Sequence, residues 1–404
     1  MKRTHLVLFA SLAGVLLASV ACGTLLAITP EPEVADGGAE GASATEAATD
    51  AGDAGPITIT SPDGKLGLSI SPSTLDLVAG DATPRALAVT LTRQGSDPVT
   101  LSLTDGTDLT VAGMTSGITG ANVTLSIGAV AGMPRRLDVG LIAKMGVSTV
   151  VAPLTVLVAR HYREGGSMQT LTVSTTQTFL VQAWGGGGGL PLGSGGGYAE
   201  DLVVLQPGEY LVVVGTGGGN GGAPGSPGGG AGISNVGGGG GYSGLFAQPS
   251  GAPVFASALV VAGAGGGGCS DAQANNPQRG GAGGSTGSTP AENGGSANGA
   301  GGLGAGPSTF GNGGASGGSA GSALRGGSGT VSGGGGGGGY WGGGGGGATG
   351  GGGGGSSYAK NGGLTQGGMN ILPGHSGAMS SPNEMLRANA GNPGSPGAVL
   401  IIPK

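Results

Sequence analysis

The stretch GGGGGGGYWGGGGGGATGGGGGGSSY, residues 333–358, decides how this chain folds. It contains three unbroken runs of six or seven glycines, in a chain of 404 residues that holds 103 glycines. Only 21 of these glycines lie in residues 1–184, so the composition divides the chain near residue 184. The glycines do not recur at every third residue, which excludes collagen.

Segments rich in β-forming residues lie at the ends of the glycine runs. Composition alone predicts a flexible Gly/Ser linker, but a flexible linker is not expected to carry strand-forming segments at the ends of its glycine runs. Two of the segments flank Gln206-Pro207-Gly208, which is typical of a hairpin. We therefore predict an ordered domain over residues 165–404, with strands at Leu171–Val173, Thr178–Trp184, Tyr198–Leu205, Glu209–Val214, Ala258–Ala262 and Ala398–Ile402.

The order of these segments carries a family resemblance over residues 165–404. Ala183-Trp184 before glycines, Gly196-Gly197-Tyr198-Ala199, Pro207-Gly208-Glu209 before a valine run, Leu259-Val260-Val261-Ala262-Gly263, the runs that end at Tyr340-Trp341 and Ser356-Ser357-Tyr358, and the terminal Pro396–Ile402 all contribute to it. The region resembles the glycine-rich extracellular domain of the anaplastic lymphoma kinase and leukocyte tyrosine kinase receptors and its bacterial secreted counterparts. The resemblance implies a jelly-roll-like β framework that carries a bundle of polyglycine II helices and takes part in ligand binding outside the cell. No HRD or DFG motif is present, so it implies no kinase.

Physical chemistry favours the same packing. A left-handed threefold helix rises about 3.1 Å per residue and makes no internal hydrogen bonds, so each N–H and C=O needs a partner in another run. Without Cβ atoms, neighbouring runs come close enough to supply those partners. Ordering each glycine costs about 1–2 kcal/mol or more, and each hydrogen bond contributes about 0.5–1.5 kcal/mol net. An isolated run therefore does not fold, and the strands are needed to hold the runs together.

Residues 57–160 show a different pattern, in which apolar and polar residues alternate in short runs between turn signals. We predict an antiparallel β-sandwich that serves as a spacer or stalk. The stretch loosely resembles the immunoglobulin-like modules of bacterial surface proteins, although it has no Cys…Trp…Cys framework. The alternating runs are Leu66/Leu68/Ile70, Leu87/Val89/Leu91, Val99/Leu101/Leu103, Val123/Leu125/Ile127, Leu137/Val139/Leu141 and Leu154/Val156/Val158.

The first 22 residues have the features of an export signal. Lys2 and Arg3 precede an apolar stretch, and small residues precede Cys22. The arrangement resembles a bacterial lipobox, which would make Cys22 the site of lipid attachment; ordinary cleavage after Ala21 is the alternative. Residues 23–56 follow as a predicted disordered acidic linker, because they carry seven acids, no Lys or Arg and few large apolar residues.

Several classes of function are excluded. A net charge of −6 argues against nucleic-acid binding, and two cysteines are too few for a disulfide scaffold. The GxGxxG pattern at residues 263–268 is not followed by an apolar helical face, so it does not indicate a nucleotide site. We expect no metal, no cofactor and no enzymatic activity, and we expect Cys269 to be a buried free thiol.

The aromatics that interrupt the glycine runs are the candidate contact residues: Tyr198, Tyr242, Tyr340, Trp341 and Tyr358. Rigid aromatic side chains are effective anchors, although they could instead cap the bundle and pack on the sheets.

We expect an exported cell-surface or secreted protein with a non-enzymatic role in adhesion, recognition or envelope structure. Its partner would be a surface protein or polysaccharide, and it would meet the membrane only through a lipid on Cys22. The alternative is a protein that binds ice or polysaccharide surfaces through a flat polyglycine face. Regularly spaced Ser or Thr on such a face would favour this alternative, and exposed aromatics at the ends of the runs would favour adhesion.

Overall fold

The computed structural model describes residues 56–79, 84–104, 108–113, 115–130, 132–190, 192–233, 236–269, 278–285, 289–295, 300–367 and 389–404. All of them belong to one compact unit, Ala51–Lys404. The predicted leader with Cys22, and the acidic linker up to residue 55, lie outside the described residues. Within these ranges the chain forms eighteen strands and a single turn of 3-10 helix at Phe255–Ser257. The predicted all-β fold class is thus confirmed.

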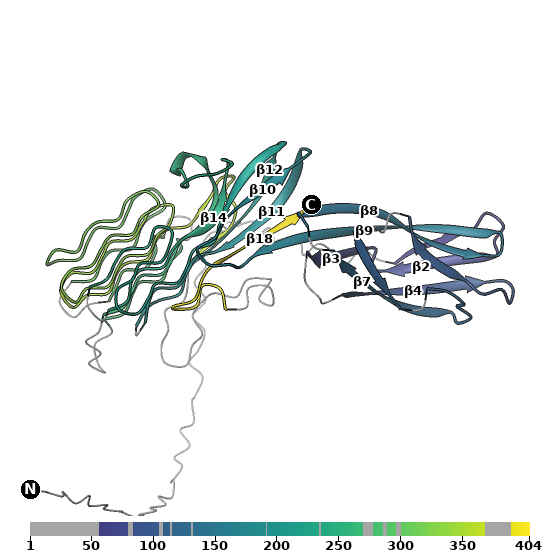
Figure 1. Cartoon of the computed structure of the whole chain (residues 1–404), viewed down its shortest axis with the longest axis horizontal. Helices are drawn as coiled ribbons and strands as arrows, with labels where there is room; N and C mark the ends of the chain where they lie inside the picture. The colour runs from purple at the N-terminus through teal and green to yellow at the C-terminus, as the bar shows by residue number, and fades with distance from the viewer. Residues whose placement is uncertain are drawn as a thin grey trace, which may run out of the picture. The chain divides into compact units, whose positions relative to one another are not determined.

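Residues 57–162 form two facing sheets (Figure 1). The first sheet has the order β1-β2-β4-β7-β6, made of Ile57–Thr60, Leu66–Ser71, Arg85–Arg93, Asn122–Ala129 and Leu109–Ala112. The facing strands are β3 (Thr74–Val78), β5 (Thr100–Leu103), β8 (Arg135–Met145) and β9 (Ser148–Tyr162). Each of the six alternating runs falls on a strand or directly beside one, and its apolar side chains enter one shared core.

One strand pair in this sandwich is parallel, which the sequence pattern did not predict. After Ser71, the end of β2, the chain crosses to the other sheet and β3 lies parallel to β9, with Leu75 opposite Val156. Leu75 and Leu77 are buried in the core that β2 also contributes to. The crossing therefore lets two successive apolar segments cover opposite sides of the same core.

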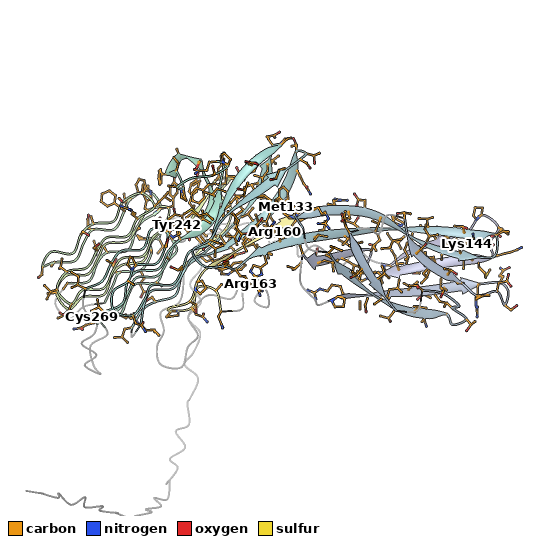
Figure 2. The ribbon with its side chains drawn as sticks, viewed as in Figure 1. Met133, Lys144, Arg160, Arg163, Tyr242 and Cys269 are labelled. Carbon is orange, nitrogen blue, oxygen red and sulfur yellow. The ribbon has the colours of Figure 1, made fainter. Side chains whose placement is uncertain are left out.

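The strand β9 does not stop at the predicted domain boundary. Its 15 residues pair with β8 over most of their length, and its last residues pair with β18 (Ala398–Pro403), with Tyr162 opposite Val399. Val158 is buried in the first core and Tyr162 in the second. At this joint the Arg160 guanidinium lies 4.7 Å from the Tyr162 ring centre, and its Nη1 donates to Met133 Sδ at 3.0 Å (Figure 2).

The second sandwich is built from two sheets that enclose another core. One is the five-stranded sheet β10-β13-β14-β15-β16, made of Met168–Val173, Gly208–Val213, Ser243–Phe246, Ala258–Ala262 and Tyr358–Ala359. The other is an eight-stranded sheet of order β17-β12-β11-β18-β9-β8-β5, with β3 beside β9; its strands not yet introduced are β17 (Thr365–Gln366), β12 (Tyr198–Leu205) and β11 (Gln177–Trp184).

The predicted hairpin around Gln206-Pro207-Gly208 is wrong. The strand β12 pairs with β11, whereas β13 pairs with β10, so the turn carries the chain from one sheet to the other. The link between β10 and β11 makes the same crossing, and Thr176 Oγ1 donates to Gln206 Oε1 at 2.8 Å between the two links. The strands β12 and β13 each bury apolar side chains. Because the two strands lie in facing sheets, these side chains can pack against each other between the sheets.

The glycine runs leave these strands as extended tracts that belong to no sheet and lie side by side (Figure 1). We call six of them the inner tracts, because nearly all of their residues are buried: 185–189, 237–241, 263–268, 333–339, 342–347 and 350–355. Four further segments, the outer tracts, alternate buried with exposed residues: 300–305, 311–315, 319–322 and 325–331.

The hydrogen bonds of the inner tracts repeat every three residues. In tract 333–339, Gly334 and Gly337 donate to Gly350 and Gly353, both at 2.9 Å. Gly335 and Gly338 donate to a second neighbour, at Gly237 and Gly240, and Gly336 donates to a third, at Gly327. The carbonyls of the same tract accept from three other segments, at residues 343/346, 264/267 and 230. One tract is therefore bonded to six neighbours.

This close packing leaves no room for a side chain. At all 19 glycines of tracts 333–339, 342–347 and 350–355, an added Cβ atom would lie under 3.0 Å from backbone atoms of another segment. Real Cβ atoms essentially never come so close to backbone, so a neighbouring tract would have to move. The purity of the glycine runs is thus a steric requirement of this packing.

Candidate recognition surface

Five aromatic side chains from four separate segments meet at one end of the inner tracts. We call them the aromatic row. Tyr340 is at its centre, stacked between Phe255 and Tyr358 with ring centres 4.1 and 4.0 Å away. Trp341 packs at a tilt on Phe255 at 4.6 Å, and Phe310 lies 6.3 Å from Trp341. The row therefore runs continuously across the ends of several tracts.

The glycine tracts hold the row through their backbone. Tyr340 and Trp341 form the link between tracts 333–339 and 342–347, and both of their amide groups bond to Ser356, at 2.9 and 3.0 Å. Phe310 directly precedes tract 311–315, and Tyr358 begins β16. The link that carries Tyr340 and Trp341 is therefore held by two bonds to Ser356, which directly follows tract 350–355.

The row is partly open to solvent. Phe310 is 46% exposed, and the other four rings are half-buried. Burial raises the pKa of the Tyr340 hydroxyl, and the neighbouring Tyr358 raises it further. The row is thus a partly exposed surface made of five aromatic side chains.

Of the five aromatics predicted as contact residues, the structure brings three together and buries two. Tyr340, Trp341 and Tyr358 belong to the aromatic row. Tyr198 is 3% exposed, packs on Trp184 at 5.3 Å and donates to Glu200 Oε2 at 2.5 Å. Tyr242 is 2% exposed (Figure 2), and burial raises its pKa.

Tyr198 and Tyr242 are therefore removed from the candidate surface. Both stand directly at the junction of a glycine tract and a strand. Each is buried in a small cluster apart from the sandwich core, Tyr198 with Trp184 and Leu400 and Tyr242 with Phe246 and Leu324. Phe255 and Phe310 were missed by sequence reasoning. Phe310 does border a glycine-rich segment, which is the signal that could have identified it, whereas nothing in the sequence around Phe255 marks it.

A groove of about 820 Å³ adjoins the row at Tyr358. It lies where β16, on the edge of the five-stranded sheet, and β17, on the edge of the eight-stranded sheet, approach the glycine tracts. No acidic or basic side chain occurs among the described residues that line it: Ser285, Pro307, Ser357, Tyr358, Ala359, Gly362, Gly363, Leu364, Thr365 and Gln366.

The outer tracts expose a second regular feature. In tracts 319–322 and 325–331 every third residue is exposed, which places Ser319 and Ser322 beside Arg325, Ser328 and Val331. The two tracts are bonded to each other through the Ser319 amide and the Ser328 carbonyl, at 3.0 Å. At about 3.1 Å of rise per residue, such side chains repeat about every 9 Å along a tract.

Cys269 is buried at the end of tract 263–268 and forms no disulfide, as predicted (Figure 2). Its Sγ donates to the Ser332 carbonyl at 2.8 Å. In the described part of the chain, no group of three or more His, Cys, Asp or Glu side chains is arranged to hold a metal ion. The same residues include no helix with the length and apolar character needed to cross a membrane.

Comparison with family models and with curated proteins gave no match to this chain.

Proposed function

We propose that this chain is an exported cell-surface protein that recognises a surface ligand, a protein or a polysaccharide, through the aromatic row and without catalysis. The observation that carries the proposal is the convergence of five aromatic rings from four segments at one partly exposed end of the glycine tracts. Aromatic side chains that are already immobilised lose little entropy on binding, so they are effective anchors.

The scaffold behind the row is, in our proposal, a polyglycine II bundle on a jelly-roll-like framework. The three-residue repeat of the hydrogen bonds supports it, because a threefold helix directs successive amides toward three different neighbours. The six bonded neighbours of tract 333–339 support it as well. Such a bundle would present the aromatic row as a rigid surface, and it is the architecture that the resemblance to the receptor domain implies.

A direct adhesion assay tests the recognition role. Beads that carry the full chain are applied to surfaces coated with cell-wall polysaccharide, with mucin or with extracellular-matrix protein. We expect retention on at least one coating, and we expect Trp341→Ala or Phe310→Ala to reduce it about tenfold or more, since truncated anchor aromatics commonly dominate binding. Tyr210→Phe is the matched control, because Tyr210 lies between the two sheets, where its hydroxyl bonds to Gln206. Equal retention of all variants, or retention on no coating, would refute the role.

The proposed location rests on the leader and on Cys22. A lipid on Cys22 followed by an acidic linker and a β-sandwich would hold the glycine tracts away from the membrane. Metabolic labelling with a fatty-acid analogue tests the anchor by comparing wild type with Cys22→Ser. Loss of label in the variant supports the anchor, and equal labelling of both proteins contradicts it.

The regular outer face favours a second candidate function, the binding of an ice or polysaccharide surface. Ser319 and Ser322 are exposed three residues apart on one tract, and Ser328 is exposed on the tract bonded to it, which is a regular pattern of the kind such a role needs. The matched experiment is an ice-recrystallisation assay and a cellulose pull-down with the triple serine-to-lysine variant. If that variant loses activity while Trp341→Ala retains it, the outer face and not the aromatic row is the binding site.

A further inference from the structure

The groove beside the aromatic row combines an aromatic ring with neutral polar groups that have no hydrogen-bond partner in the described part of the chain. Within the described residues, the hydroxyls of Tyr358 and Thr365 and the side-chain amide of Gln366 make no hydrogen bond. All three residues are half-buried, and none of their polar atoms is among the described polar atoms that are closed off from solvent without a partner. A groove of this kind can offer several hydrogen bonds to a ligand at little cost in broken protein contacts.

The ring of Tyr358 is held in place from one side. It stacks on Tyr340 with ring centres 4.0 Å apart and planes inclined by only 10°. One face of the ring is thus taken by Tyr340, and Tyr358 is also one of the residues that line the groove. A ligand in the groove would therefore meet the other face. The face of an aromatic ring carries partial negative charge and attracts the weakly positive C–H groups of an apolar ligand face.

The groove offers no compensation for a charged ligand. Its described lining has no acidic or basic side chain, so a carboxylate, sulfate or phosphate would lose hydration without gaining an opposite charge. A sugar ring has one face of C–H groups and a rim of hydroxyls that both donate and accept. The amide of Gln366 and the hydroxyls of Thr365 and Tyr358 match that rim.

We propose that this groove binds a neutral saccharide, with a sugar ring packed on the free face of Tyr358 and its hydroxyls bonded to Thr365 and Gln366. The inference rests on the proposed function and specifies its ligand class. The groove would take one unit of a glycan chain, and the aromatic row would contact the units that follow.

A glycan array tests the inference. The labelled full chain is applied to neutral oligosaccharides (cellohexaose, maltohexaose, mannohexaose, xylohexaose and N-acetylchitohexaose) and to acidic ones (oligogalacturonate and chondroitin sulfate). Hits are then measured by titration calorimetry. We expect retention on at least one neutral glycan and at least tenfold weaker binding to the acidic ones.

Two variants report on the groove. Tyr358→Ala removes the ring, and Thr365→Val removes one hydroxyl at constant volume without disturbing the stack on Tyr340. We expect about tenfold or greater loss of affinity for the first and a smaller loss for the second, and equal affinity of Thr365→Val and wild type would contradict the groove as the site. Preference for acidic glycans, or binding to no neutral glycan, would also overturn the inference. Phe310→Ala separates this from the proposed function: if it abolishes adhesion while no neutral glycan binds, the aromatic row recognises another ligand.

Discussion

Replacing Gly344 by alanine should destabilise the glycine tracts strongly. An added Cβ at Gly344 would lie under 3.0 Å from the carbonyl of Asn312 and from the amide nitrogen of Gly313, both backbone groups of the outer tract 311–315. That tract would have to move away, although it is bonded to tract 342–347 through Gly311 to Gly342 and Gly314 to Gly345, both at 2.9 Å.

The magnitude follows from these contacts. Weakening two hydrogen bonds costs about 1–3 kcal/mol, and forcing a methyl group into a packed interior costs about 1–3 kcal/mol. Reduced freedom of the unfolded chain offsets about 0.4–1 kcal/mol of this. The net loss in the free energy of unfolding is then about 3 kcal/mol. Burial alone does not decide the outcome, because Ala264 and Ala305 are native buried residues in these tracts.

Gly367→Ala is the matched control. A Cβ added there meets only the carbonyls of Gly283 and Gly284, at the ordinary contact distance of 3.9 Å. We expect its stability to equal that of the wild type or to exceed it by up to about 1 kcal/mol. Equilibrium urea unfolding measures all three proteins through the fluorescence of the two tryptophans, Trp184 and Trp341, which both border glycine tracts. Equal unfolding of the two variants would refute the steric account of the glycine runs.

Three further predictions concern the whole fold. Amides of tract 333–339 should resist hydrogen exchange, measured by mass spectrometry. Deletion of 398–404 should abolish that protection, because β18 joins β9 to β11. Unchanged protection would contradict the prediction that the strands hold the tracts together. The hydroxyls of Ser148 and Ser61 lower the pKa of Asp63 from 3.8 to about 2. Asp63 therefore stabilises the folded state above pH 3.8 and loses that contribution as the pH falls toward 2. The melting temperature of Asp63→Asn should then fall less than that of the wild type over this pH range. Parallel curves of melting temperature against pH would exclude this contribution of Asp63. Finally, Cys269 should react with a thiol reagent only after unfolding, and rapid labelling of the native protein, in a variant whose other cysteine is replaced, would show that it is not buried.

Local patterns predicted the strands well where each strand could be judged alone. Leu66/Leu68/Ile70 and Leu154/Val156/Val158 alternate because one side of each strand enters a core, and that period is visible without any partner. The apolar composition of Ala258–Ala262 and Ala398–Ile402 also predicts strands, and the structure has strands at Ala258–Ala262 and Ala398–Pro403. Pairing was not predictable in the same way. The turn at Gln206-Pro207-Gly208 suits a hairpin, but whether β12 and β13 pair or face each other depends on β10 and β11, which lie earlier in the chain.

The candidate surface was also predictable only in part from the sequence. A Tyr-Trp pair between two glycine runs signals a link at the end of the tracts, so Tyr340 and Trp341 could be identified from the sequence. Their stacking on Phe255 and Tyr358 could not, because those residues are far away along the chain. Tyr198 and Tyr242 have the same local signal as Tyr340. Only the packing of distant segments, such as Leu324 on Tyr242 and Leu400 on Tyr198, distinguishes the buried rings from the partly exposed one.

The amino-acid sequence by itself determined that this chain is all-β and that its glycine runs require close backbone neighbours. These properties follow from side-chain period and from the absence of Cβ atoms, which are local. Only the tertiary structure decided which six segments surround tract 333–339 and which aromatics share one surface. A glycine has no side chain that could distinguish one neighbouring tract from another, so its neighbours depend on parts of the chain outside the tract, and we expect the strands at the ends of the tracts to select them.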